Sequence, residues 1–305
     1  MKFSIIIPTY NEEADIGETL NSLIQLTYDK KEILVVDDST DQTPDIVRSY
    51  ASMGVTLIRP AKRGGRCEAR NLGIRSADGE VIVILNADVR PRSDFLEQLL
   101  AHYTLGYDYV LVGSKVSNTD SFLARYIGAI ADMDYAGDTS WMEWTEGFSC
   151  RRELAIKAGL FPVGHPIPIC AGEDGFFGEN LRKLGAKRVL DLNIIVDHVA
   201  PGNLGEFWQI RKGRGCGGPQ FRRFIQRWSF GKIIARAILR LIKSTIIVLL
   251  VFPPVIINWK VSSFSMYGKR DLFPFIGAWF IELLAYHVGE WQSVREVMKA
   301  EELNS

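Results

Sequence analysis

The 305-residue chain has few cysteines, and their spacing suggests no structural role. Its four cysteines lie far apart and form no C-x-x-C pair, so neither a zinc site nor a disulfide framework is expected. The N-terminal apolar run is too short for a signal peptide and lacks a small-residue cleavage site. The sequence also shows no internal repeat or low-complexity tract. These absences predict a folded first domain that stays in the cytosol.

Acidic residues are missing from one stretch, although the net charge of the chain is zero. Residues 1–210 carry 21 Lys and Arg against 30 Asp and Glu, whereas residues 211–243 carry 10 Lys and Arg and no acid. No nucleic-acid partner is expected. The local basic run predicts contact with anionic membrane lipid.

Short β-branched runs alternate with helical patterns over about the first 110 residues. Strands are predicted over residues 3–7, 32–36, 55–58, 81–85 and 109–112. The first, second and fourth runs are almost continuously apolar, which indicates strands buried on both faces, as in a parallel sheet. The pattern predicts an α/β fold with one Rossmann-like sheet flanked by helices.

Polar residues collect where these strands end, and ligands of such sheets bind beyond the carboxyl ends of the strands. Pro8-Thr9-Tyr10-Asn11-Glu12 follows the first strand, Asp37-Asp38 the second and Asn86-Ala87-Asp88 the fourth. A carboxylate pair after a strand is also a common turn or cap feature, so a structural role for Asp37 and Asp38 stays open.

Asp88 and His198 are the candidate ligands for a metal ion. A diphosphate brings Mg²⁺ or Mn²⁺, and such ions need only one or two carboxylates in addition to phosphate oxygens and water. A histidine ligand favours Mn²⁺. The alternatives are an inconsequential surface carboxylate and a structural histidine.

Five motifs together resemble the family-two glycosyltransferases of GT-A fold over about residues 3–200. In chain order they are Pro8-Thr9-Tyr10-Asn11-Glu12, Val35-Val36-Asp37-Asp38-Ser39, Gly65-Arg66 with Ala69-Arg70-Asn71-x-Gly73, Asn86-Ala87-Asp88, and Glu173-Asp174. Each motif is weak alone, but their order and spacing are specific. One departure is Asn86, where the family's motif usually begins with Asp.

The resemblance implies roles for the matching positions. Asp88 would hold the metal, and Asp174 would be the catalytic base. Donor binding would involve Pro8, Thr9, Tyr10, Glu12, Asp38, Arg66, Arg70, Asn86, Ala87 and Asp88. Arg70 in particular would lie near the nucleotide.

The chemistry asks for the same kinds of group. Displacing a nucleoside diphosphate requires neutralisation of the leaving group and a base for the acceptor hydroxyl. Asp174 begins a predicted helix, whose dipole favours the ionised carboxylate, and the adjacent Glu173 raises one of the two pKa values. An acidic first helical turn without a catalytic role is the alternative. In-line displacement with a single base predicts inversion at the anomeric carbon.

A third group of residues is assigned to the acceptor or to phosphate: Glu146, Gly147, Glu173, Arg211 and Arg214. The two arginines are predicted to lie in a Gly-rich loop and to neutralise diphosphate or a lipid phosphate; the alternative is that they belong to the membrane-facing basic patch. Trp208-Gln209-Ile-Arg211 partly resembles the Gln-x-x-Arg-Trp motif of processive family members, but Lys212 and Gly213 occupy the Arg and Trp positions. Long-chain polysaccharide synthesis is therefore not expected. The pocket near residues 141–147 and 162–172 should select the acceptor.

The C-terminal third is predicted to associate with a membrane. Residues 221–243 have an apolar face and a basic remainder, as in an interfacial helix. Residues 244–259 carry no charge, and residues 272–289 carry only Glu282 and His287 as ionisable groups. Because a spanning helix needs roughly 20 residues, and because Pro253-Pro254 breaks the first segment, two passes, a re-entrant hairpin and a soluble helical layer all stay open.

The predicted domains are a catalytic GT-A domain over 1–210, a basic interfacial region over 211–243, a hydrophobic membrane hairpin over 244–289 and a polar tail over 290–305. The predicted function is metal-dependent, inverting transfer of a sugar from a nucleotide-diphosphate donor at the cytosolic membrane face. A glycan or polyprenyl-linked acceptor is expected. The alternative is a catalytically impaired protein that binds nucleotide sugar or lipid phosphate. A dinucleotide-binding oxidoreductase is disfavoured, because no Gly-rich turn follows the first strand.

Overall fold

The computed structural model describes residues 1–140, 142–250 and 252–302. Trp141 in the predicted acceptor pocket, Val251 in the predicted hairpin and residues 303–305 of the predicted tail lie outside the described residues. The chain divides into two compact units. Unit 1 comprises residues 1–115, 141–163 and 173–198, and unit 2 comprises residues 116–140, 164–172 and 199–305. The predicted boundaries at 210, 243 and 289 stay predictions.

Unit 1 is built on a mixed sheet of eight strands in the order β3-β2-β1-β4-β7-β6-β8-β5. The strands are β1 Phe3–Thr9, β2 Lys31–Asp37, β3 Val55–Ile58, β4 Val81–Ile84, β5 Val89–Pro91, β6 Tyr109–Val116, β7 Phe148–Arg151 and β8 Arg188–His198. Strands β1 to β4 are parallel, and Ile5 of β1 pairs with Ile33 of β2 and Val83 of β4. The five predicted strands are confirmed within a few residues.

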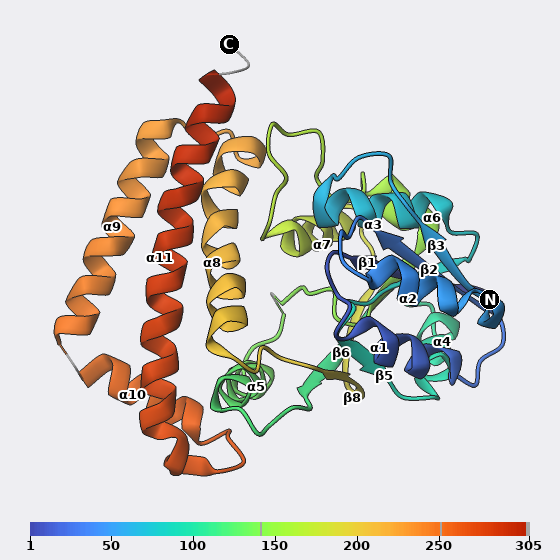
Figure 1. Cartoon of the computed structure of the whole chain (residues 1–305), viewed down its shortest axis with the longest axis horizontal. Coiled ribbons are helices and arrows are strands. Elements are labelled where there is room, and N and C mark those ends of the chain that lie inside the picture. Colours follow the sequence, from blue (N-terminus) through green and yellow to red (C-terminus); the bar gives the residue numbers. More distant parts are fainter. Residues whose placement is uncertain (141, 251, 303–305) are drawn as a thin grey trace. The chain divides into compact units, whose positions relative to one another are not determined.

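Helices cover both faces of this sheet (Figure 1). Alternate β1 residues Phe3, Ile5 and Ile7 pack into the core with α1, α2 and α4, whereas Ile6 packs on the other face with α3, α6 and α7. This alternation follows from the twofold side-chain period of a strand. The helices are α1 Ile16–Ile24, α2 Thr43–Ser49, α3 Gly65–Ser76, α4 Phe95–Thr104, α6 Arg152–Lys157 and α7 Glu173–Lys183, with the 3₁₀ turn η1 at Ala51–Met53.

The strand that the sequence indicates before His198 is present as β8, but two other strands were missed by the sequence reasoning. β5 has three residues and pairs antiparallel with β8, and β7 has four and lies antiparallel between β4 and β6. Segments this short show no measurable period, and only their sheet partners define them as strands. Both strands matter for the site, because β5 begins directly after Asp88 and β7 begins directly after Gly147.

Unit 2 is helical. Its elements are α5 Phe122–Tyr135, α8 Leu204–Gln220, the π-helical turn η2 Phe221–Ile225, α9 Phe230–Leu249, α10 Phe252–Ser262, the 3₁₀ turn η3 Gly268–Asp271 and α11 Leu272–Glu302. Helices α8, α9 and α11 run alongside one another (Figure 1). Tyr126 of α5 packs edge-on against Phe207 of α8 and Phe275 of α11, at ring-centroid distances of 6.2 and 5.4 Å.

The predicted Gly-rich loop around Arg211 and Arg214 is wrong, because both residues lie within helix α8. Glycine disfavours a helix intrinsically, but here it allows two backbones to approach closely. A Cβ atom on Gly215 would lie 2.1 Å from the carbonyl oxygen of Tyr286 in α11, and one on Gly289 would lie 2.0 Å from that of Lys212 in α8. Tertiary packing therefore overrides the helix propensity.

The predicted single amphipathic helix over 221–243 is also wrong. A π-helical turn follows Pro219, Arg227 takes a left-handed conformation with φ of 59°, and α9 begins only at Phe230. Proline lacks a backbone donor, and such a loss disturbs the regular helix. Basic residues of the first half therefore face protein groups: the Arg223 guanidinium donates to the carbonyl of Trp228 over 2.8 Å.

Apolar C-terminal helices are present, and the first apolar segment is broken as predicted, but just before Pro253-Pro254, which lie in the first turn of α10. α9 ends at Leu249, α10 begins at Phe252, and the two helices make an angle of 84°. Within the described residues, one helix over residues 268–300 is long and apolar enough to cross a membrane, and the bent pair is a second candidate. One-third of the most apolar part of the first candidate is buried inside the protein.

Candidate active site

The carboxylate of Asp37 ties the ends of β1 and β2 together. Asp37 is fully buried and accepts hydrogen bonds from the Thr9 hydroxyl at 2.8 Å and from the Ser39 backbone at 3.2 Å. The guanidinium of Arg59 forms an ion pair with its other oxygen. Asp37 and Thr9 therefore stabilise the turn, and the half-buried Asp38 next to them accepts no side-chain hydrogen bond from the described residues.

The two loops that follow these strands are joined by further hydrogen bonds. Asn11 has a left-handed backbone with φ of 57°, and its backbone N–H donates to the Ser39 hydroxyl at 2.7 Å. The amide of Glu12 donates to the Thr43 hydroxyl at 2.9 Å. Pro8 is half-buried, whereas Tyr10 is 38% exposed, with the Arg63 guanidinium 3.5 Å from its ring centroid. The loop edge thus presents an aromatic ring beside a cation.

Glu12 lies in an acidic environment. Its pKa is raised to about 8, chiefly by burial; the charges of Asp88, Asp15 and Asp41 contribute to the rise, and Arg66 opposes it. A cation bound close to these carboxylates would lower the pKa of Glu12 again.

Asp88 meets His198 because β5 pairs with β8. Val89 is the register partner of His198, so the preceding Asp88 comes beside the imidazole, with 3.3 Å between Oδ2 and Nε2. The Nδ1 atom of His198 lies 3.7 Å from a carboxylate oxygen of Glu146. Asn86 and Ala87 complete the turn: the Asn86 carbonyl accepts from the Val89 amide at 3.3 Å.

These donors fit a divalent cation. The Oδ1 atom of Asp88 is buried and has no hydrogen-bond partner among the described residues, so a lone pair is left for a ligand. Carboxylate oxygen and imidazole nitrogen are the ligand types expected for Mn²⁺. No group of three or more His, Cys, Asp or Glu side chains forms a complete metal site in the described part of the chain, so phosphate and water would supply the remaining ligands.

Arg70 organises the second cluster. It is 2% exposed, and one guanidinium nitrogen lies 3.0 Å from Glu173 and 2.9 Å from Asp174. Its other terminal nitrogen donates to the Thr145 hydroxyl at 2.7 Å. The guanidinium therefore holds the two acidic residues at the start of α7, rather than pointing freely towards a ligand. Arg66, with 55% of its side chain exposed, lies 3.6 Å from Glu173.

Asp174 is the more accessible of the two carboxylates. Its side chain is 27% exposed, compared with 2% for Glu173. The pKa of Asp174 is raised to about 6, chiefly by burial; Arg70 opposes the rise, and the charge of Glu173 adds to it. A carboxylate with a raised pKa, ionised at neutral pH and partly exposed, has the properties of a general base.

Thr145 contacts Arg70, and Glu146 approaches His198. Gly147 comes directly after these two residues. Its φ is +80°, and a Cβ atom there would lie 2.5 Å from the side chain of Val112. Only glycine combines this backbone conformation with such close packing.

Arg211 and Arg214 belong to unit 2. Arg211 is buried and its guanidinium lies 3.3 Å from Glu282, whereas Arg214 is exposed. Sequence reasoning missed Arg59 and Thr145. Thr145 was detectable from its position before the Glu146-Gly147 pair, but Arg59 carries no signal other than its place at the end of a strand.

The fold is that of GT-A glycosyltransferases. It superposes on the mannosyltransferase PcManGT of Pyrobaculum calidifontis in complex with GDP-Man and Mn²⁺ with a TM-score of 0.59 at 22% identity, covering 95% of this chain and 87% of that one. The structure of S. aureus TarS residues 1–349 in complex with UDP-GlcNAc gives a TM-score of 0.56 at 18% identity, with 97% and 92% covered. The predicted fold class is confirmed.

Residues 4–165, over half of the chain, match Glycosyl transferase family 2. The chain belongs to this family, which confirms the resemblance inferred from its motifs and the prediction that it is a transferase enzyme.

Curated relatives cover different shares of the chain. The glycosyltransferase AglE of Haloferax volcanii is 29% identical over 267 residues, or 82% of each chain. The dolichol-phosphate mannosyltransferase of Pyrococcus furiosus is 36% identical over 187 residues, 55% of this chain and 51% of that protein. The poly(ribitol-phosphate) beta-N-acetylglucosaminyltransferase TarS of Staphylococcus aureus is 42% identical over 94 residues, 29% of this chain but only 16% of that protein.

Proposed function

We propose that this protein transfers a sugar from a nucleoside diphosphate sugar to a hydroxyl or phosphate acceptor with inversion of configuration. The observation that carries the proposal is the network in which buried Arg70 holds Asp174, on the same unit as the Asp88–His198 pair. Family membership and the donors named for similar structures, UDP-GlcNAc and GDP-Man, support the donor class.

The nucleoside would lie at the joined ends of β1 and β2. Asp38 would accept hydrogen bonds from the base or ribose, because its neighbour Asp37 is already fully used by Thr9, Ser39 and Arg59. Tyr10 would border the base. The rigid cross-links between the two loops hold these groups in place before the donor arrives, which reduces the entropy cost of binding.

Asp88 and His198 would hold Mg²⁺ or Mn²⁺ at the donor diphosphate. The bound ion would neutralise the charge that develops on the departing diphosphate. Exposed Arg66 would contribute to the same neutralisation. Asn86 has an oxygen but no charge, so Asp88 carries the metal affinity that a second carboxylate supplies elsewhere in the family.

Asp174 would take the proton of the acceptor hydroxyl as its oxygen attacks the anomeric carbon. Arg70 and Thr145 fix the orientation of the carboxylate, and Glu173 keeps its pKa high enough for proton transfer. The hydroxyl oxygen forms the new glycosidic bond while the bond to the nucleoside diphosphate breaks. Attack from the face opposite the leaving group inverts the anomeric centre.

The acceptor is proposed to be a glycan or polyprenyl-linked, at the cytosolic face of a membrane. Support comes from unit 2, where Leu239, Leu249 and Phe252 are 66%, 74% and 76% exposed, in a region that also carries basic residues. Apolar side chains with basic neighbours are typical of helices that contact anionic membranes. The name of the Pyrococcus relative, a dolichol-phosphate mannosyltransferase, agrees with a lipid-linked acceptor.

Metal-stimulated hydrolysis of a nucleotide sugar tests the donor half of the proposal. A screen of nucleotide sugars by thermal shift with Mn²⁺ first identifies the donor. Asp88→Ala should abolish the metal stimulation, and NMR of the transferred glycoside should show the inverted anomer. A catalytically impaired binding protein would instead bind the donor without turnover, and a retained configuration would refute the single-base mechanism.

A further inference from the structure

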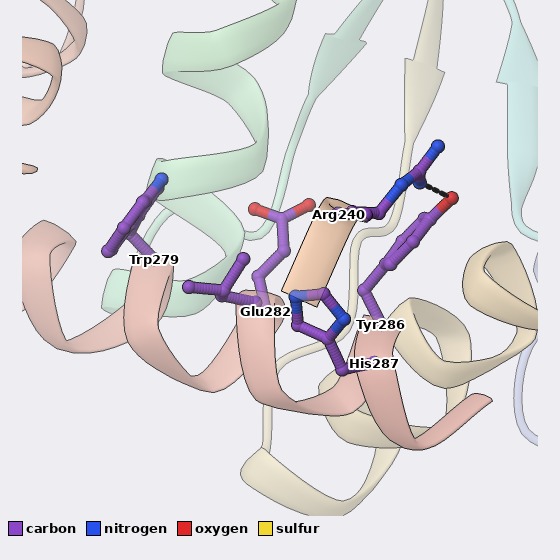
Figure 2. A pocket seen from close by; sticks show the side chains of 6 residues that line it. Arg240, Trp279, Glu282, Tyr286 and His287 are labelled. Atoms are coloured by element: carbon purple, nitrogen blue, oxygen red, sulfur yellow. Dashed lines mark hydrogen bonds between the residues drawn. The ribbon is translucent and has the colours of Figure 1, made fainter. Parts of the chain in front are cut away.

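A pocket in unit 2, between α9 and α11, contains none of the residues proposed above for sugar transfer. Its volume is about 240 Å³. Its lining, shown in Figure 2, consists of Arg240, Trp279, Glu282, Leu283, Tyr286 and His287. Pockets that enclose whole small-molecule ligands measure about 300–1,000 Å³. This pocket is therefore large enough for one end of a ligand only.

The surface of the pocket is almost entirely apolar, and the cation in its lining is Arg240. Arg240 bonds to the hydroxyl of Tyr286, as Figure 2 shows, and its Nε lies 3.6 Å from the buried carboxylate of Glu290. Arg222 lies 3.9 Å from the same carboxylate oxygen. Two guanidinium groups share one carboxylate, so one positive charge is left over. An anion at this place would balance it.

The other ionisable groups in the lining do not cancel this charge. The carboxylate of Glu282 lies 3.3 Å from the guanidinium of Arg211 and accepts from the hydroxyl of Tyr126 at 2.8 Å. His287 is paired through Nε2 with the hydroxyl of Ser244 at 2.9 Å. Arg240, with 28% of its side chain exposed, remains the accessible cation.

The rest of the pocket is apolar. Trp279 and Leu283 are half-buried in its lining, and Leu239 and Ile242, on the same helix as Arg240, are 66% and 51% exposed. A small hydrophilic anion would leave this apolar surface in water. An amphiphile with an anionic head and a hydrocarbon chain would cover both.

We propose that this pocket binds the phosphate head of a lipid. Arg240, oriented by Tyr286, contacts the phosphate oxygens, and the first part of the hydrocarbon chain lies on Trp279 and Leu283. The residues of this pocket belong to unit 2, whereas the residues proposed for sugar transfer belong to unit 1.

Binding of short-chain phosphatidic acid to the full-length protein in mild detergent tests this proposal. A thermal-shift titration should give saturable stabilisation, with a weaker response to short-chain phosphatidylcholine and to inorganic phosphate. Arg240→Gln should lower the affinity for phosphatidic acid about tenfold or more, the size of one charge-assisted hydrogen bond. Arg270→Gln, which removes the same charge from an exposed position outside the pocket, should leave it unchanged.

Three results would overturn the proposal. Equal loss in the two arginine variants would mean general electrostatic attraction, and an equal response to inorganic phosphate would mean that the hydrocarbon chain contributes nothing. If Arg240→Gln does not fold, Tyr286→Phe replaces it in the test, because this change keeps the size of the side chain and removes the hydroxyl that orients Arg240. Unchanged affinity for phosphatidic acid in Tyr286→Phe would be the third result. Asp88→Ala should bind the lipid normally, so failure of the proposed sugar transfer would leave this result unaffected.

Discussion

Arg70 is a buried cation whose charge is matched by two carboxylates from a distant part of the chain. Arg70→Gln would leave Glu173, 2% exposed, without its nearest cation. Removing one partner of a buried ion pair costs about 3–5 kcal/mol. We expect the free energy of unfolding to fall by about that amount, as measured by denaturant titration.

Arg66 provides the matched control for this prediction. It approaches the same Glu173 at 3.6 Å, but its side chain is 55% exposed. Exposed pairs contribute about 0–1 kcal/mol because water and salt screen them. Arg66→Gln should therefore leave stability almost unchanged; similar losses in both variants would show that burial does not determine the role of Arg70.

The pH dependence of turnover should report the protonation of Asp174. Only the ionised carboxylate accepts a proton, and its pKa is raised to about 6 by burial, with a further contribution from Glu173. At saturating substrate, kcat should be highest well above pH 6 and should fall as the pH decreases through about 6.

Glu173→Gln tests the assignment of that acidic limb. The change removes a neighbouring negative charge, so the pKa of Asp174 falls and the limb moves to lower pH. Asp174→Asn should lower kcat by about 10²–10⁴-fold, the usual contribution of a general base. An acidic limb that keeps its wild-type position in folded Glu173→Gln would assign the base to another group.

At the scale of elements, α8 and α11 contact each other through glycine. A Cβ atom on Gly289 would lie 2.0 Å from the carbonyl oxygen of Lys212. Gly289→Ala must separate the helices, and overpacking of this kind costs about 1–3 kcal/mol. Gly277 lies in the same helix with nothing within 4 Å of its Cβ position, so Gly277→Ala should instead stabilise by about 0.5–1 kcal/mol. Thermal unfolding should shift in opposite directions.

At the scale of the whole molecule, the exposed apolar side chains of α9 account for the proposed membrane attachment. Leu239 and Leu249 are 66% and 74% exposed. Replacing both with Glu should move the protein to the soluble fraction after centrifugation of salt-washed membranes, because a charged side chain opposes insertion. Leu105→Glu changes an equally exposed leucine of unit 1, at 75%, and should have no effect. Membrane retention of the double variant would favour α11 as a spanning anchor.

The sequence alone determined the parallel half of the sheet and the family. Strands β1 to β4 are continuous apolar or β-branched runs, and the polar residues that follow them are local in sequence, so their pattern is visible without a structure. The apolar and basic composition of the C-terminal third was equally evident.

Only the tertiary structure decided which side chains meet. Arg70 and Glu173 are 103 positions apart, and Asp88 reaches His198 through a three-residue strand too short to show a period. The glycines of α8 predict a loop by local propensity, but they form a helix because the backbone of α11 packs against them. Each of these outcomes depends on packing between distant segments, and the free energy of that packing is not encoded in any local pattern.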